Sequence, residues 1–287
     1  MMCKTILIIS LFSFAWMQSL HPLNTMPISS RDLSSSGGGG AILSDEITLN
    51  PASVWTPQKC MNFHTQSLPS EISLFSLQTI YPTDKTIYFA SMTNLNFGTL
   101  KDGISNETFL ANDIMLKVGL KKKGFNLFSM GGSVSYSFSQ IGNKTAQAIL
   151  ISTGVRTEIT ENQGGFGLTL RNVGFQFDNY ESSQEFIPYQ LHISGYIKPK
   201  HLPSLIFSDI IIEENINGIT FISGMEFYLQ KGLIMKFSNR GLFQNNYKLS
   251  SIAFGFQFNI KNWKIELASQ NLISAGITNG ITISRPY

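Results

Sequence analysis

Alternating apolar and polar positions run along most of the chain, most clearly over residues 128–140, FSMGGSVSYSFSQ. One set of alternate positions is apolar apart from Gly132 and the final Gln140, and the other set is serine or glycine throughout. Because successive side chains of a β-strand point to opposite faces, this pattern predicts a strand with one apolar and one polar face. A soluble antiparallel sheet produces the same alternation. The pattern therefore predicts strands, but it does not show which face meets a closed space.

The same analysis predicts about fourteen strands, because β-branched and aromatic runs lie between turn residues throughout the chain. The predicted strands are 58–66, 71–81, 85–96, 109–119, 127–139, 144–156, 164–173, 187–197, 203–212, 219–229, 231–239, 248–258, 262–270 and 276–285. An even number is typical of single-chain outer-membrane barrels. Longer links are expected after strands three, seven, eleven and thirteen, and short links after strands two, eight, ten and twelve. This asymmetry favours an up-and-down barrel with short periplasmic turns.

Charged residues fall opposite the large apolar residues in the predicted strands. Near the end of the chain, Phe254, Phe256 and Phe258 share one face with Ile252 and Ile260. In a barrel of this kind the apolar face meets lipid and the polar face lines the lumen. The predicted lumen-facing residues are Arg171, His192, Glu226, Lys236, Lys264 and Glu266.

Composition narrows the class of protein. Charged residues make up 14% of the chain, against roughly 25% in typical soluble domains. No internal apolar run approaches the roughly 18 residues of a spanning helix, which excludes a helical membrane protein. The net charge of +3 is too small for a nucleic-acid-binding surface, so we expect no nucleic-acid partner. The two cysteines, Cys3 and Cys60, cannot form a disulfide framework in a processed chain.

The first part of the chain divides into three predicted segments. Residues 1–19 carry Lys4 followed by an apolar run and predict a secretory signal peptide. Residues 20–40 are rich in Ser, Pro and Gly, which predicts a linker. Residues 41–57 are expected to form a short plug or latch, and residues 58–287 the transmembrane barrel. The plug candidates are Asp45, Glu46, Asn50 and Pro51, whose polar groups suit a charged lumen wall; residues 37–40 are expected to act as its hinge.

Several spaced motifs resemble the PorV/PorQ family of outer-membrane barrels, which is related to FadL-type transporters and associated with type IX secretion. The motifs are Gly39-Gly40-Ala41, Asp45, Asn50-Pro51-Ala52, residues 131–139 followed by 146–154, and the segment 165–174 followed by 188–195 and 205–209. The resemblance covers most of residues 37–285. It implies an accessory or shuttle component of a type IX-like secretion or surface-attachment system. The partners implied are secretion-apparatus or cargo proteins, with outer-membrane lipid around the barrel.

No pattern in the sequence predicts catalysis. The four histidines are scattered without metal-ligand spacing, and neither a phosphate-binding loop nor a nucleophile elbow is present. We therefore predict no catalytic, cofactor-binding or metal-binding residues, and residues 121–123, three lysines, are expected to form a turn. Two alternatives stay open: a FadL-like barrel for uptake or export of a hydrophobic ligand, and a secreted soluble β-sandwich that binds a partner.

Overall fold

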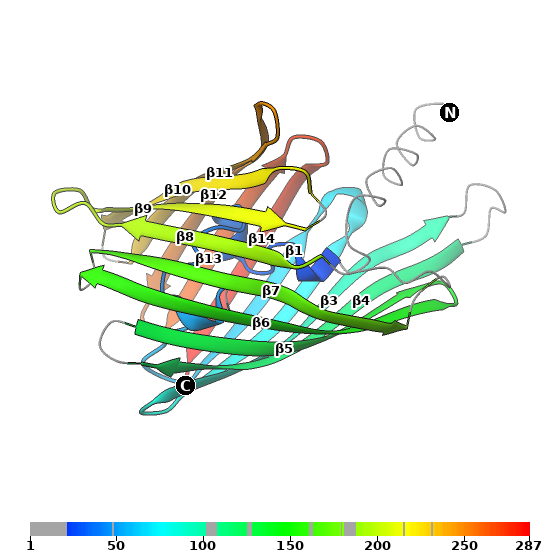
Figure 1. The fold of residues 1–287 in the computed structure, drawn as a ribbon, viewed down its shortest axis with the longest axis horizontal. Coiled ribbons are helices and arrows are strands. Elements are labelled where there is room, and N and C mark those ends of the chain that lie inside the picture. Colours follow the sequence, from blue (N-terminus) through cyan, green and yellow to red (C-terminus); the bar gives the residue numbers. More distant parts are fainter. Residues whose placement is uncertain are drawn as a thin grey trace.

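A computed structural model describes residues 22–47, 49–101, 108–124, 128–160, 163–178, 180, 188–214, 216–230 and 232–287. The expected signal peptide, residues 1–19, lies outside the described residues. Within them, fourteen antiparallel strands form one closed barrel in which each strand pairs with its neighbour in sequence (Figure 1). The last strand closes on the first, with Cys60 paired to Pro286. The predicted all-β, up-and-down barrel is confirmed.

Each predicted strand overlaps an observed one. The strands are β1 (Cys60–Ser67), β2 (Ser73–Pro82), β3 (Thr86–Lys101), β4 (Thr108–Lys123), β5 (Phe128–Ile141), β6 (Lys144–Thr160), β7 (Gly164–Asp178), β8 (Gln190–Ile197), β9 (Ser204–Glu213), β10 (Ile219–Gln230), β11 (Leu233–Phe243), β12 (Tyr247–Ile260), β13 (Trp263–Leu272) and β14 (Gly276–Pro286). No helix in the described part of the chain is long and apolar enough to cross a membrane.

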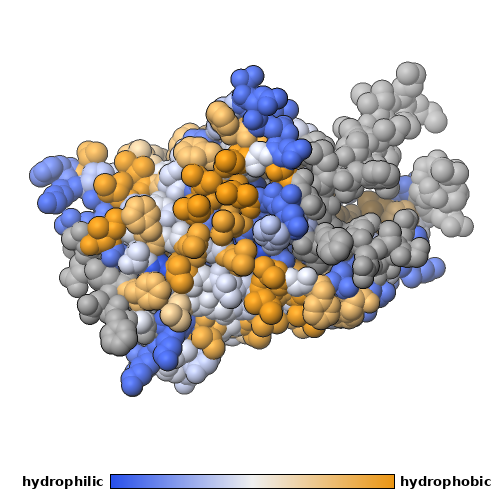
Figure 2. All heavy atoms as spheres, in the orientation of Figure 1, coloured by the Kyte–Doolittle hydropathy of each residue, from blue (hydrophilic) through white to orange (hydrophobic). Residues whose placement is uncertain are grey.

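The apolar face of each strand points outward. Phe254 and Phe256 are exposed on the outside of β12, whereas Ser133, Ser135 and Ser137 of β5 are buried toward the lumen. Closure pairs every strand with two neighbours over at least part of its length, which suits a wall whose backbone cannot bond to lipid. Figure 2 shows apolar side chains spread across the outer face. A soluble β-sandwich is therefore the wrong alternative, because one closed sheet presents its apolar face to the surroundings.

The links between strands differ from the expected lengths. Strands β3, β7 and β11 run on to Lys101, Asp178 and Phe243, so much of each expected long link is paired strand. The expected alternation of long links after odd-numbered strands and short links after even-numbered strands holds only in part, since a six-residue link at 198–203 follows an even-numbered strand. Strand β1 starts and strand β14 stops at the same end of the barrel. The opposite end carries the longer connections overall, including residues 179–189, and we assign it as extracellular.

The expected turn at residues 121–123 is wrong. Strand β4 continues to Lys123 and pairs with β5 through Lys121, Lys122 and Lys123. The Lys121 side chain is buried. Strand pairing continues because the backbone groups of these residues find partners on β5, and lysine does not break a ladder as proline does.

The N-terminal segment lies inside the barrel and is longer than expected. It contains η1 (Pro22–Asn24), α2 (Ser30–Ser34) and η2 (Pro51–Ser53), and residues 29–41 are buried throughout. The linker predicted for residues 20–40 is therefore corrected over residues 22–40, which are continuous with the expected plug. We call residues 22–57 the plug.

Candidate functional site: a plugged lumen

The plug begins in an apolar pocket at the extracellular half of the lumen. Leu23 packs there against Leu74, Leu95 and Met115, which project inward from β2, β3 and β4. Met26 and Ile28 of the plug lie against the same cluster. Lumen walls of water-filled barrels are polar. An apolar cluster in this position therefore forms a lumen surface suited to an apolar occupant, which in this structure is the plug itself.

Wall side chains hold the backbone of this first part of the plug. The Asn24 carbonyl accepts hydrogen bonds from Arg171 Nη2 at 2.9 Å and from Asn172 Nδ2 at 3.1 Å. Gln66 Nε2 of β1 donates to the carbonyls of Pro27 and Ile28. A short polar segment can thus be ordered in a lumen without a large apolar core of its own, because the wall satisfies its backbone.

Helix α2 lies against the β12–β14 side of the wall. Its N-cap is Ser29, whose Oγ accepts from the Asp32 N–H at 3.1 Å. The Ser30 N–H donates to Thr282 Oγ1 at 2.9 Å. Close approach requires Gly255, since a Cβ there would lie 2.5 Å from the Ser34 Cβ. Burial raises the pKa of Asp32 to about 6.

The four consecutive glycines form a docking segment. The N–H groups of Gly39 and Gly40 donate to the two carboxylate oxygens of Asp209 at 2.9 and 3.0 Å. A Cβ at Gly38 would lie 2.7 Å from Ile222, and Gly39 has a positive φ of 78°. Glycine is thus needed here for close approach to the wall, which is the physical reason that the expected linker is ordered.

The Asn50-Pro51 turn rests on a groove of glycines. Asn50 caps η2 by accepting from the Ala52 N–H at 2.9 Å, and its Nδ2 donates to the Val155 carbonyl. Gly131 and Gly154 face each other on β5 and β6 beneath it. A Cβ at Gly131 would lie 2.5 Å from the Pro51 carbonyl carbon, and one at Gly154 would overlap Asn50 Oδ1. The glycines in the two hairpin strands therefore form the seat of the plug.

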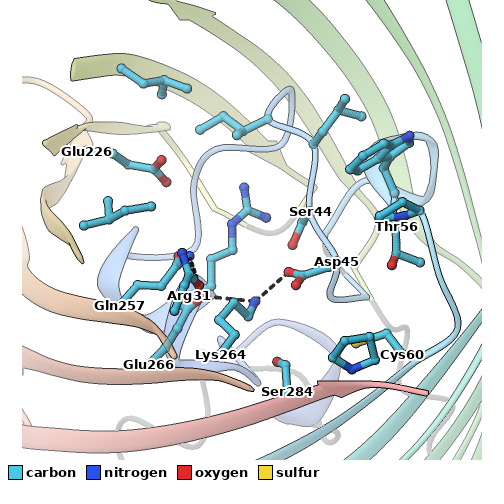
Figure 3. A pocket seen from close by; sticks show the side chains of 18 of the residues that line it. Arg31, Ser44, Asp45, Thr56, Cys60, Glu226, Gln257, Lys264, Glu266 and Ser284 are labelled. Carbon is cyan, nitrogen blue, oxygen red and sulfur yellow. Dashed lines mark hydrogen bonds and ion pairs between the residues drawn. The ribbon is translucent and has the colours of Figure 1, made fainter. Parts of the chain in front are cut away.

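An ion network closes the periplasmic mouth. Lys264 Nζ contacts Asp45 at 2.5 Å and Glu46 at 2.7 Å on the plug, and Glu266 at 3.1 Å on the wall. Lys236 completes the chain at 2.9 Å from Glu266. The network borders a hollow of ≈ 580 Å³ that Arg31 and Glu226 also line (Figure 3). The Glu46 and Glu266 carboxylates are buried, so the pair of Glu46 with Lys264 holds plug to wall more firmly than a surface pair would, whereas Asp45 is partly exposed.

The structure places all six predicted lumen residues on the inner face. Lys236, Lys264 and Glu266 are joined in the ion network. Glu226 accepts from the Tyr228 hydroxyl at 3.3 Å. Arg171 holds the Asn24 carbonyl. The remaining one, His192, lies 3.2 Å from the Gln190 side-chain oxygen, which also accepts from Arg171.

The four plug candidates all contact the wall or brace the turn that rests on it. Sequence analysis missed Asp209, Gln66 and Arg156, whose Nε donates to the Ala41 carbonyl at 2.7 Å. In the sequence, these residues are marked only by being polar and by falling at alternate positions that face the lumen. Within the described residues, no group of three His, Cys, Asp or Glu side chains could hold a metal ion.

Comparison with known proteins identifies the fold. No family model matches the sequence, and no curated protein matches it. The structure is similar to the P. putida toluene transporter TodX, with a TM-score of 0.68 and 9% identity over 92% of this chain and 99% of that chain. A Pseudomonas aeruginosa FadL homologue gives a TM-score of 0.60 and 10% identity over 91% and 98%.

This protein has the fold of FadL-type outer-membrane barrels. The outer-membrane location expected from the sequence agrees with that fold. Such low identity carries the architecture and leaves the activity open. The finer resemblance to PorV/PorQ stays a prediction.

Proposed function

We propose that this protein passes small hydrophobic molecules across the outer membrane. The observation that carries the proposal is the apolar cluster of Leu74, Leu95 and Met115 inside the extracellular half of the lumen. A channel for hydrophilic solutes has no use for such a surface, whereas an apolar solute gains free energy by leaving water for it. The solute would displace the plug side chain Leu23 that occupies the cluster.

A break in strand pairing beside this cluster supports a route out through the wall. Strand β7 pairs with β8 only as far as Arg171 and Gln190, while its remainder, to Asp178, pairs with β6 alone among the described residues. The break begins at Asn172, which has a positive φ of 61°. Because the plug blocks the periplasmic mouth, a solute leaving here would enter the membrane directly without crossing the ion network.

The named activities of similar structures point the same way. TodX is described as a toluene transporter, and a TodX mutant, with a TM-score of 0.66 to this chain, as a monoaromatic hydrocarbon channel. These descriptions belong to those proteins. They support a hydrophobic substrate here because the apolar lumen cluster offers the matching chemistry.

Uptake of a radiolabelled monoaromatic hydrocarbon tests the proposal. Cells lacking the protein are complemented with the wild type, Met115→Gln or Met92→Gln. Placing an amide in the apolar cluster should slow initial uptake by roughly fivefold or more. Met92 is the matched control, because it is half-exposed on the lipid side of the neighbouring strand, and its variant should take up hydrocarbon normally. Equal uptake by the wild type and by cells without the protein would refute the function.

A second candidate function rests on the completeness of the plug. Wall residues from many strands hold it from Leu23 to Ala52, which suits a closed barrel that presents its ends to a protein partner. This agrees with the type IX-like role that the sequence resemblance implies, with a secretion-apparatus or cargo protein as partner. Cross-linking in cells followed by detergent extraction tests it: a secreted or secretion-machinery protein bound stoichiometrically would favour this role, and an uncomplexed barrel would count against it.

A further inference from the structure

The outer wall has an apolar hollow where β7, β8 and β9 approach the periplasmic end. Its volume is ≈ 680 Å³. Gly195 of β8 lines it, paired with Phe166 on one side and Ser208 on the other. Gly195 adds no side chain of its own, and the Phe166 ring lies over it, with ring carbons 3.3 Å from where a Cβ would stand. The neighbouring apolar residues that line the hollow are Phe166, Ile193, Ile197, Ile206 and Ile210.

Cationic side chains border the hollow at its periplasmic end. The link between β8 and β9 begins Lys198-Pro199-Lys200-His201, and Lys198 and Lys200 line the hollow. The Lys198 N–H donates to the Gln163 carbonyl at 2.7 Å, which fixes the start of this link against β7. In Figure 2, apolar atoms over β8 and β9 give way to hydrophilic atoms at the left, where this link projects.

We propose that the hollow binds one anionic glycerophospholipid of the periplasmic leaflet. An acyl chain lies in the hollow against the Phe166 ring and the isoleucines of β8 and β9, and the phosphate meets the ammonium groups of Lys198 and Lys200. Apolar lining at membrane depth matches the chain, and basic side chains at the membrane boundary attract the anionic headgroup. The inference rests on the outer wall and is independent of what crosses the lumen.

A second copy of the chain fits this hollow less well. In a two-fold symmetric pair within one membrane, the same surface patch of each copy meets at the same depth. That arrangement would bring the lysines of Lys198-Pro199-Lys200 close to their own counterparts, where like charges repel. An anionic lipid instead neutralises them, so the charge pattern favours lipid as the occupant.

Quenching of a single tryptophan by brominated lipid tests the site. The probe Phe166→Trp is placed in a chain carrying Trp16→Phe, Trp55→Phe and Trp263→Phe, and the matched probe is Leu77→Trp, which faces lipid on β2. The turn beyond Leu77 carries both Asp84 and Lys85 and so has no net charge. Each protein is reconstituted in two bilayers of phosphatidylcholine and phosphatidylglycerol. In one the phosphatidylglycerol is brominated, and in the other the phosphatidylcholine is brominated.

The proposal predicts that phosphatidylglycerol is preferred at the Phe166→Trp probe by about fivefold and shows no preference at the Leu77→Trp probe. Adding Lys198→Gln with Lys200→Gln should abolish the preference, and Gly195→Leu, which fills the hollow, should reduce it. Lys85→Gln is the control substitution and should change nothing at the Phe166→Trp probe. If phosphatidylglycerol is preferred equally at the two probes, the proposal is overturned, and this comparison needs no lysine variant. A preference that survives loss of both lysines would overturn it as well.

Discussion

At the scale of single residues, glycines decide whether the plug can seat. Gly131 and Gly132 are adjacent on β5 but face opposite sides: a Cβ at Gly131 would lie 2.5–2.7 Å from plug backbone atoms, whereas one at Gly132 would have its nearest neighbour at 3.8 Å. We expect Gly131→Ala to cost about 1–3 kcal/mol in stability through overpacking. Gly132→Ala is the matched control and should be close to neutral. Thermal unfolding in detergent measures both, and equal losses would contradict the seat.

Asp32 should make plug stability depend on pH. Burial, together with the charge of Glu46, raises its pKa to about 6 from an ordinary 3.8, although Arg31, Arg171 and Lys117 oppose the shift. A carboxyl whose pKa is raised in the folded state favours folding most at low pH, and that contribution is lost as pH rises through about 6. Asp32→Asn should therefore gain stability over the wild type at pH 7, by about 2–3 kcal/mol at most.

The advantage of Asp32→Asn should shrink toward pH 4, where the folded wild-type carboxyl is protonated and the unfolded one is about half protonated. The melting temperatures of the two proteins are compared from pH 4 to pH 8. The difference between them reports on Asp32, because the effects of groups that titrate in both proteins cancel. A difference that stays constant across this range would show that Asp32 does not titrate inside the plug.

At the scale of elements, the ion network should hold the plug to β13. Lys264 is the cation shared by Asp45, Glu46 and Glu266. Lys264→Met would leave the buried Glu46 without its cation, and breaking a buried pair in this way typically costs about 3–5 kcal/mol; Glu266 keeps Lys236, and the partly exposed Asp45 loses less. We expect the plug to loosen at its periplasmic end while the barrel stays closed. A cysteine placed at Ser44, which is buried, should then react faster with a water-soluble maleimide.

Lys261→Met is the matched control for this prediction. Lys261 lies in the exposed turn between β12 and β13 and takes part in none of the ion pairs found among the described residues. Its loss should leave labelling at the Ser44→Cys position unchanged. Equal labelling in the Lys264→Met and wild-type backgrounds would mean that the hydrogen bonds of the glycine segment suffice to hold the plug.

The elements also show which parts of the fold can be predicted from sequence. Strand alternation is local, so all fourteen strands could be predicted, together with the facing of those, such as β5 and β12, in which one set of alternate positions is apolar and the other is mostly small or polar. The plug upstream of Ala41 could not, because it has little apolar surface and is ordered by distant wall groups such as Asp209 and Thr282. Lys264 pairs with Asp45, which lies 219 positions away in the sequence. The pattern of apolar and polar positions does not predict which distant residues pair. The composition of residues 20–40 predicted a linker because these residues have little apolar surface to bury. Composition does not include the backbone hydrogen bonds that a surrounding barrel wall can supply.

At the scale of the whole molecule, the plug should set the permeability of the barrel. It is bound at both ends, by the apolar cluster around Leu23 and by the ion network at Lys264, and helix α2 lies between them against β12–β14. We expect the intact protein to conduct few ions in a planar bilayer. Deleting residues 29–53 removes α2, the glycine segment and the Asn50-Pro51 turn, and should give a steady conductance because polar side chains then line an open lumen.

The outcome of that deletion also separates the two candidate functions. If the deleted protein conducts ions while the intact protein takes up hydrocarbon without conducting, the solute must leave the lumen without passing the plug, as the break between β7 and β8 allows. A large conductance in the intact protein that the deletion does not change would refute the plug. A barrel that stays closed after the deletion, with its gel mobility showing it folded, would mean that wall side chains fill the lumen. Transport through the lumen would then lose its physical basis, and binding to a protein partner at the barrel's ends would be the better account.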